Sequence, residues 1–446
     1  MTNPTPESTG TPEVPAQSFP RISSLTRRDV VKSMVVAGGA VVFAGYGRYG
    51  KAAAQDVVRL SQWYHQYGEA GTEDAARRYA EQYTTENPAV EVEMVWVLGD
   101  YEGTVLAAAL LTDEGPDVYE GHISYAMVKA GQAEPLDDLL TPEVKADFHP
   151  NNLATNTVNG KVYAIKMIDD MGLLYYRKSV LSEAGITPPT TMDELIAASK
   201  ALDTGRVKGL FLGNDGGISA LNTIAPWSAG TDFIDPATNK IILDPARTAL
   251  SFQKIKELND SGALLIGAPT DWWDPSAFND GLAAMQWTGL WAMPGITAGV
   301  GDDFGVVPWP ALDAQGTPAT FWGGWSEMAN PRGQNKNVAE AKKLISWLWI
   351  QKTDLQQDWS LSYGFHVPPK LSAAAAAEPL KTGPASEAVA ALNSYGKILP
   401  PQWTAAMGTM LNDSIANIVK NGADATAEVN SLIGKLQAEL DTVVAP

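Results

Sequence analysis

The sequence of 446 residues contains no cysteine and only four histidines. The absence of cysteine excludes disulfide bonds, thiolate metal sites, a cysteine nucleophile and a lipid-attachment cysteine. The four histidines are separated by long stretches and show no metal-ligand spacing, so we expect no metal. No apolar run reaches the ~20 residues that a permanent membrane span needs.

Basic residues are also scarce. The chain has 32 lysines and arginines against 51 acidic residues, which gives a net charge of −19. Such an acidic protein is a poor partner for nucleic acid or for an anionic membrane surface. The glycine-rich run 213–217 lacks the Lys-Ser/Thr of a phosphate-binding loop and the spacing of a dinucleotide site, so we expect no nucleotide cofactor. Asn214 in this run remains a candidate ligand-binding residue.

The N-terminal region is typical of an exported protein. Residues 2–20 are rich in Pro, Thr and Ser and predict disorder. The pair Arg27-Arg28 precedes an apolar run at 34–46, and Ala52-Ala53-Ala54 offers a cleavage site. This order resembles a twin-arginine signal peptide over residues 1–54. The resemblance implies export by the twin-arginine translocase to the periplasm or cell surface, without a cysteine-linked lipid anchor.

Apolar patterning then predicts alternating strands and helices. Residues 57–63 and 90–96 predict strands, and residues 72–83 between them predict a helix with one apolar face. Alternation of this kind indicates an α/β fold with a mainly parallel sheet and helices on both faces. Two amphipathic helices are expected at the C-terminal end of the chain.

The most informative stretch is 159–202. Asn159-Gly160 predicts a hairpin-type turn, because both residues tolerate positive φ. The run 173–176 predicts a strand, and Asp169-Asp170 lie where the chain must cross towards it. Further on, Thr191-x-x-Glu194 is a capping box that opens a helix.

This stretch resembles the extracellular solute-binding proteins of ABC importers, specifically the carbohydrate-binding, maltose-type group. The family pattern has a turn, "Y-x-I-P", an acid and "L-Y-Y-N-K"; Lys166 replaces the usual proline here, and Arg177 the usual asparagine. Further runs are Gly115-Pro116-Asp117-Val118, beside the family's "G-x-P-D-V", then "F-x-x-G-x-A-A-M … G-x-W" at 278–291, and Gly323-Gly324.

The resemblance implies a two-lobed periplasmic-binding-protein fold, with a mainly parallel sheet and flanking helices in each lobe. Three crossovers are expected near 165–170, near 322–326 and near His366. Lobe one would comprise residues 56–166 and 326–366, and lobe two residues 167–322 and 367–446. The ligand would lie between the lobes, at the carboxyl ends of the strands. The protein is expected to be a monomer that works with the permease subunits of an importer.

The resemblance also implies the binding residues. Trp291 and Trp403 match family tryptophans that stack on sugar rings, and either Asp169 or Asp170 would bind hydroxyl groups. Other candidates lie in loops that line the family's cleft or beside its glycine and tryptophan motifs: Trp63, Tyr64, His65, Glu120, His122, Trp287, Gly324 and Trp325.

The resemblance favours a carbohydrate-binding protein whose ligand is an oligosaccharide. Two alternatives remain open. An exported glycosidase could use two carboxylates such as Glu120 and Asp170, although nothing in the sequence marks an activated pair. A binding protein for a polyamine or an organic anion is the other. An anion would require basic residues at the cleft, where only Lys166 and Arg177 are near, whereas a polyamine would require acids and aromatic residues. The family does not catalyse, and we expect no enzyme activity.

Overall fold

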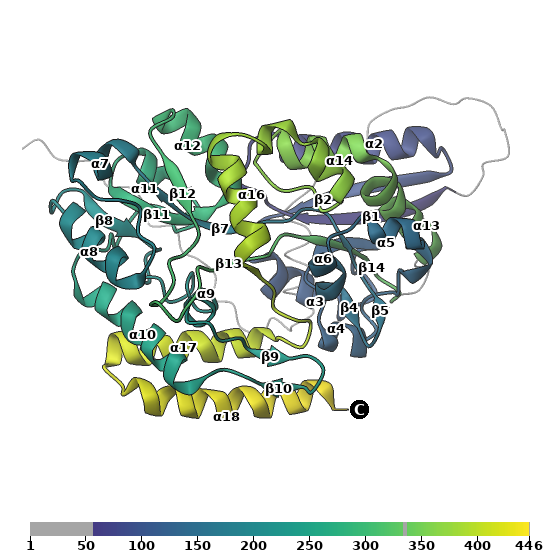
Figure 1. Cartoon of the computed structure of the whole chain (residues 1–446). Helices are drawn as coiled ribbons and strands as arrows, with labels where there is room; N and C mark the ends of the chain where they lie inside the picture. The colour runs from purple at the N-terminus through teal and green to yellow at the C-terminus, as the bar shows by residue number, and fades with distance from the viewer. Residues whose placement is uncertain (1–56, 333–336, 446) are drawn as a thin grey trace, which may run out of the picture. The chain divides into compact units, whose positions relative to one another are not determined.

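The computed structural model describes residues 57–332 and 337–445, so the predicted signal segment with Arg27-Arg28 lies outside the described residues. The described chain folds as two lobes, each built on a mixed sheet that is surrounded by helices (Figure 1). We call the part with the five-stranded sheet lobe one and the part with the four-stranded sheet lobe two. The predicted two-lobed α/β fold is confirmed, whereas the residue boundaries of the lobes remain a prediction.

The sheet of lobe one has the strand order β2-β1-β3-β14-β6. Its strands are β1 (Val58–His65), β2 (Val90–Val97), β3 (Val118–Gly121), β6 (Ile165–Lys166) and β14 (Ser326–Ala329). β1 is parallel to β2 and β3, while β14 is antiparallel to both of its neighbours. Parallel neighbours need a long crossover within one lobe. β14 is instead reached by a chain that returns from lobe two, and it can therefore run in the opposite direction.

The helical segments of lobe one cover this sheet. They are α2 (Thr72–Glu86), a π-helical turn (Tyr101–Leu106), α3 (Ala107–Ala109), α4 (Tyr125–Lys129), α5 (Pro142–Ala146), α6 (Pro150–Thr155), α13 (Val338–Ser346), a second π-helical turn (Trp347–Gln351) and α14 (Thr353–Leu361). The segment 101–109 is thus only partly α-helical. Gly103 and Thr104 are poor helix formers, and the side chain of Asp100 binds both of them.

The sheet of lobe two has the order β12-β7-β11-β8, with β7 antiparallel to its two neighbours. Its strands are β7 (Gly172–Tyr176), β8 (Lys208–Phe211), β11 (Ala283–Gly289) and β12 (Gly305–Val307). Every residue of β11 is buried, as expected for a strand covered on both faces.

The helices of lobe two are α7 (Lys178–Glu183), α8 (Met192–Leu202), α9 (Ile224–Ser228), α10 (Pro245–Asp260), α11 (Ser276–Asn279), α12 (Met293–Val300), α16 (Gly383–Tyr395), α17 (Ala405–Asn421) and α18 (Ala425–Val444). Short elements complete the described chain: β4 (Thr157–Val158), β5 (Lys161–Val162), β9 (Ile234–Asp235), β10 (Lys240–Ile241), β13 (Thr320–Phe321), β15 (Gly396–Lys397), α15 (Leu371–Ala376) and the 3-10 turns Asp137–Leu139, Leu290–Ala292 and Glu378–Leu380.

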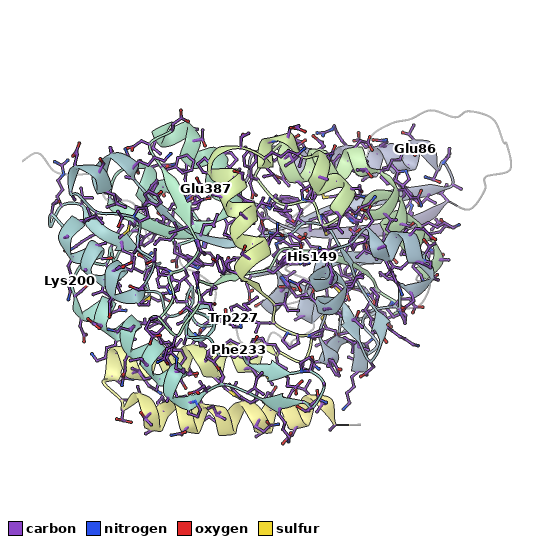
Figure 2. The ribbon with its side chains drawn as sticks, viewed as in Figure 1. Glu86, His149, Lys200, Trp227, Phe233 and Glu387 are labelled. Atoms are coloured by element: carbon purple, nitrogen blue, oxygen red, sulfur yellow. The ribbon has the colours of Figure 1, made fainter. Side chains whose placement is uncertain are left out.

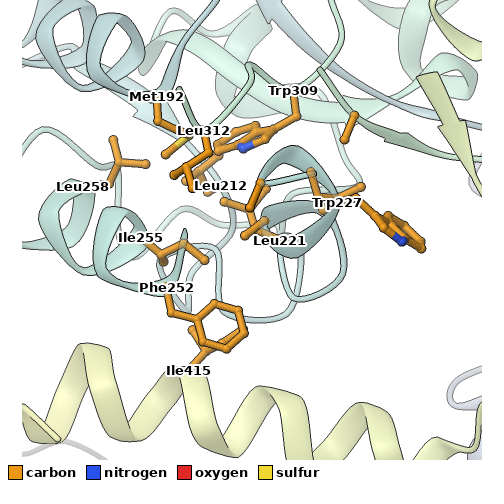
Figure 3. Close-up of a cluster of buried hydrophobic side chains, with 14 of the residues drawn as sticks. Met192, Leu212, Leu221, Trp227, Phe252, Ile255, Leu258, Trp309, Leu312 and Ile415 are labelled. Atoms are coloured by element: carbon orange, nitrogen blue, oxygen red, sulfur yellow. The ribbon is translucent and has the colours of Figure 1, made fainter. Parts of the chain in front are cut away.

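The core of lobe two joins helices that are far apart in sequence. Phe252 and Ile255 of α10 lie towards Ile415 of α17, and Trp309 and Leu312 close the cluster on the other side (Figure 3). The two C-terminal helices predicted from their apolar faces are α17 and α18, and both pack on α10. Lobe two therefore includes the C-terminal end of the described chain.

Local signals in the stretch 159–202 are confirmed. Asn159 and Gly160 have φ of 50° and 77° in the turn between β4 and β5. The Thr191 side chain accepts from the Glu194 amide, and Glu194 returns a bond to the Thr191 amide, which is the predicted capping box. These interactions join residues only a few positions apart, so they could be predicted from residue types alone.

Candidate functional site

Three segments of the chain pass between the lobes side by side. The chain leaves the sheet of lobe one after β6, returns before β14, and passes to lobe two again after α14. The backbone of Asp169 exchanges two hydrogen bonds of 2.9 Å with Val367, and Asp170 pairs with Gly323. All three predicted crossovers therefore meet at one place.

Gly324 makes this close meeting possible. Its φ is +91°, and a Cβ atom at this position would lie 2.2 Å from the carbonyl oxygen of Ile168. The carbonyl oxygen of Gly324 itself accepts a 2.9 Å hydrogen bond from Lys166 Nζ. Gly324 thus acts through its backbone, and it is absent from the lining of the cavity described next.

A cavity of about 750 Å³ lies between the two lobes beside these crossovers. This volume is within the range of sites for small molecules. Lobe one contributes the loop after β1 and the segment around Tyr363, and lobe two contributes the turn before α11 and the start of α12. The lining residues are His65, Gln66, Tyr67, Gly68, Glu69, Ala70, Gly99, Asp170, Trp273, Asp274, Pro275, Trp291, Ala292, Pro294, Gly295, Trp325, Tyr363 and His366.

A buried charge cluster lines one wall of the cavity. His366 Nδ1 lies 2.8 Å from Asp170 Oδ1, and His366 Nε2 lies 3.5 Å from Glu69 Oε1. Burial alone would lower the pKa of His366, but the charges and hydrogen bonds of Asp170 and Glu69 raise it to about 10. Burial raises the pKa of Glu69, and the bond and charge of His366 outweigh it, so that the net shift is downward. The imidazole is therefore a cation at neutral pH.

This cation makes stability depend on pH. A folded-state pKa of about 10 for His366, above the ordinary 6.5, contributes stability that is complete below about pH 6.5 and is lost as pH rises towards 10. The size is on the order of 5 kcal/mol, since the pKa rises by about 3.5 units and one unit corresponds to about 1.4 kcal/mol. We expect thermal denaturation between pH 6.5 and 10 to show a falling melting temperature for the wild type and a flatter profile for His366→Gln.

The buried acid Glu327 also makes stability depend on pH over part of this range. Burial raises the pKa of Glu327 to about 8, so the folded state loses stability as pH rises from the ordinary 4.5 to 8. Above about pH 8 the contribution of Glu327 is complete, so a difference between wild type and His366→Gln from pH 8 to 10 reports the imidazole. Parallel profiles of wild type and His366→Gln in that interval would contradict a charged imidazole.

Asp169 and Asp170 have different environments. Asp169 is absent from the cavity lining and accepts a 2.8 Å bond from Asn152. Burial raises its pKa to about 6, and Lys166 Nζ lies 4.0 Å from its Oδ1 atom. Burial also lowers the pKa of Lys166. Of the two acids that the sequence could not separate, the structure brings Asp170 to the cavity.

Trp291 lines the cavity from lobe two. A Cβ atom on Gly289 would lie 1.9 Å from the Trp291 ring, so the glycine leaves room for the indole to fold back over the end of β11. Trp291 Nε1 donates a 3.0 Å bond to the carbonyl oxygen of Trp273, and the Trp272 ring packs edge-on at 6.0 Å. The indole is fixed in orientation and only partly buried.

Trp325 lines the cavity from lobe one. Its ring stacks on the imidazole of His65 with a 4.0 Å separation of centroids, and His122 lies 4.8 Å away. Glu120 is fully buried behind His65: it accepts bonds from the His65 amide and from the Tyr67 hydroxyl, and it lies 2.5 Å from His65 Nδ1. Glu120 therefore orients His65 rather than facing the cavity. His122 is half-exposed and pairs with Glu102.

Several predicted residues lie outside the cavity. Tyr64 is buried against Trp96 and Trp359, and Trp287 is buried edge-on against Trp309. Trp63 packs in the hydrophobic cluster around Tyr101. These side chains stabilise the sheets, and we leave them out of the proposed site.

Asn214 and Trp403 are also placed elsewhere. The amide of Asn214 donates to the carbonyls of Ala268 and Thr270 and accepts from two backbone N–H groups, so both of its polar atoms are occupied. Trp403 packs edge-on against Phe233 at 4.9 Å. Phe233 lies next to Trp227 near the C-terminal helices (Figure 2). Both residues have structural contacts that account for their positions.

Sequence reasoning missed several lining residues, chiefly Tyr67, Glu69, Trp273 and Tyr363. Tyr67 and Glu69 follow the predicted strand by only a few residues, so the loop after β1 could have been extended to include them. Trp273 is half-exposed within the Trp272-Trp273 pair, an unusual exposure for such a large ring. No sequence pattern marks Tyr363, because its position depends on the third crossover.

Two further observations concern membrane spans and metal sites in the described residues. None of the helices within 57–332 and 337–445 combines the length and apolar character of a membrane span. Over the same residues, no three His, Asp or Glu side chains are grouped as a metal site.

Comparison with known proteins identifies the family. A model of the bacterial extracellular solute-binding proteins matches residues 78–391. The chain belongs to this family. The family is described as extracellular, which implies that this protein is exported.

Relatives of this binding protein carry consistent descriptions. A probable ABC transporter-binding protein of Deinococcus radiodurans is 31% identical over 224 residues, which are 46% of this chain and 51% of that protein. A maltotriose-binding protein of Pyrococcus abyssi is 25% identical over 81% of this chain and 77% of its own. The chain matches about half or less of the length of several of these relatives.

Solved structures agree on the fold. A solute-binding protein of Thermotoga lettingae bound with α-D-tagatose superimposes with a TM-score of 0.72 at 19% identity, covering 86% of this chain and 100% of that one. UgpB of Mycobacterium tuberculosis in complex with glycerophosphocholine gives 0.70 at 21% identity, covering 86% and 98%. At these identities the likeness concerns the fold and leaves the ligand open.

Proposed function

We propose that this binding protein captures a carbohydrate, favouring an oligosaccharide, between its lobes and delivers it to an ABC permease. The observation that carries the proposal is a cavity in which the rings of Trp291 and Trp325 accompany the carboxylate of Asp170. A sugar presents C–H faces that suit an indole and hydroxyl groups that suit a carboxylate. The similarity to a maltotriose-binding protein supports the same chemistry.

The residues that line the cavity do not favour an organic anion as the ligand. None of these residues, all from the described parts of the chain, is a lysine or an arginine. Lys166 is buried and bonded to Gly324, and Arg177 pairs with Asp303 at 2.8 Å. The two basic residues that the sequence offered for an anion site are therefore engaged elsewhere.

A glycosidase finds little support either. Of the two carboxylates considered for it, Glu120 is enclosed by His65 and Tyr67 and does not line the cavity. A general acid must reach the glycosidic oxygen directly or through one water molecule. Binding without turnover is thus the better account, and we propose export through the twin-arginine route to the site of uptake.

The proposal is tested with a panel of neutral sugars. Thermal denaturation is measured with maltotriose, raffinose, mannotriose, tagatose and glucose. At least one of these sugars should raise the melting temperature, because a ligand at a hundredfold excess over Kd adds about 2.7 kcal/mol to the free energy of unfolding. Chromatography of the same mixtures should show intact sugar. Release of smaller sugars would favour a glycosidase. If no sugar, neutral or aminated, changes the melting temperature, the carbohydrate assignment is wrong.

We also expect the lobes to close on the ligand. A sugar that contacts both walls of the cavity binds the closed arrangement better than an open one and therefore shifts the population towards it. Small-angle X-ray scattering should give a smaller radius of gyration when the sugar with the largest thermal shift is added to saturation. An unchanged radius would contradict closure.

A further inference from the structure

The cavity has an excess of buried acid. Its lining includes Glu69, Asp170 and Asp274 as acids, while His366 is its charged base. Glu69 and Asp170 share this one imidazolium, which lies 3.5 and 2.8 Å from them. One cation between two anions leaves a negative charge without compensation in the cluster. An uncompensated buried charge is costly, and a cationic ligand would relieve the cost.

Asp170 directs that charge into the cavity. Its side chain is 8% exposed, and Oδ1 is bonded to His366. Oδ2 accepts no hydrogen bond from any side chain or backbone group in the described chain. Asp170 thus lines the cavity and is more than nine-tenths buried, yet one of its carboxylate oxygens has no hydrogen-bond partner. This combination points to a donor supplied by the ligand.

Lys166 interacts electrostatically with Asp170 but makes no hydrogen bond with it. Lys166 Nζ donates to the carbonyl oxygen of Gly324 and lies 4.0 Å from Asp169, and it is absent from the lining. His65 lines the cavity, but its Nδ1 atom is engaged by Glu120, which lies outside the lining. A hydrogen-bond donor for Asp170 Oδ2 can therefore come from the cavity side.

The remaining lining is aromatic. Tyr67, Trp291 and Trp325 lie in the walls, and Trp273 is 51% exposed at the surface of lobe two. The negative faces of such rings attract ammonium groups, most strongly where water is excluded. Carboxylates and aromatic faces in one cavity without lysine or arginine are the combination that a protonated amine requires.

We propose that the ligand carries a protonated amine, so that the carbohydrate of the proposed function, on which this inference rests, is an amino sugar. The amine donates to Asp170 Oδ2 with Glu69 as the second anion, and the sugar ring covers an indole.

The test is calorimetric titration of the wild-type protein with matched sugars, at a pH below the pKa of the amine. Glucose, galactose and mannose are each paired with their 2-amino counterparts, and cellotriose with the β-1,4-linked glucosamine trimer. The N-acetylated trimer is the control, because its nitrogen carries no charge. The aminated member of at least one pair should bind tenfold more tightly than its neutral partner, or about 1.4 kcal/mol, and acetylation should abolish the gain.

A pair of variants locates the charge. Glu69→Gln should reduce the preference for the aminated sugar at least threefold. Glu73→Gln, which removes the same charge from the exposed face of α2 where Glu73 pairs with Arg77, should leave it unchanged. Equal affinity within every pair, or tighter binding of the neutral sugars, would overturn the inference and leave the proposed function standing. If spermidine binds and no sugar does, the inference that the ligand carries an amine stands, and the proposal that it is a carbohydrate is refuted. If no aminated probe binds, the inference fails.

Discussion

Replacing Trp291 with alanine is expected to weaken sugar binding at least tenfold. The indole lines the cavity from lobe two, and its position is fixed by the bond from Nε1 to the Trp273 carbonyl and by its contact with Gly289. Stacking on a ring should contribute about 0.5–1.5 kcal/mol beyond the burial of apolar area, which adds to the loss. A tenfold change corresponds to about 1.4 kcal/mol. Calorimetric titration with the sugar that gives the largest thermal shift measures the effect.

The matched control for Trp291→Ala is Trp309→Ala. Trp309 is a fully buried tryptophan of the same lobe, with its ring against Trp287 and away from the cavity. Its loss should lower the free energy of unfolding by about 3–5 kcal/mol and leave the affinity of the folded protein nearly intact. Full affinity in Trp291→Ala would refute this wall of the site.

Gly324→Ala is expected to lower the free energy of unfolding by more than about 3 kcal/mol. An alanine with φ near +91° bears a backbone cost of roughly 1–2 kcal/mol. In addition, its Cβ atom would meet the carbonyl oxygen of Ile168 at 2.2 Å, so one of two hydrogen-bonded crossover segments must move. Strain at over-determined positions of this kind is large because the surroundings cannot relax. Urea denaturation followed by circular dichroism gives the value.

Gly131→Ala provides the comparison for Gly324→Ala. Gly131 also has positive φ, at +65°, but no atom lies within 4 Å of its Cβ position. Only the backbone cost applies, and we expect about 1 kcal/mol. If the two variants lose similar stability, the crossover is looser than the structure indicates.

The parts of the fold that sequence reasoning predicted are those encoded locally. The Asn159-Gly160 turn, the Thr191 capping box and the apolar faces of the C-terminal helices depend on residues a few positions apart. The antiparallel directions of β7 and β14 were not predicted. They follow from pairing between segments more than 100 residues apart, as in the pairing of β14 with β3.

The site was harder to predict, because its residues come from loops that meet only in the folded chain. Trp287 lies in β11 and Trp291 in the 3-10 turn Leu290–Ala292 that follows it, yet the first is buried and the second lines the cavity. Because β11 is buried on both faces, it shows no alternation from which the direction of the Trp287 ring could be predicted. Asn214 resembled a ligand-binding amide, but the backbone of 267–270 occupies it. Asp170 is distinguished from Asp169 by its partner His366, which lies 196 positions away.

A crystal structure of the complex with the tightest-binding sugar tests the central claim most directly. The account predicts a sugar ring in the cavity between the lobes, in contact with the face of Trp291 and with a donor at Asp170 Oδ2. A sugar bound at any other place on the protein, with this cavity filled only by water, would contradict it.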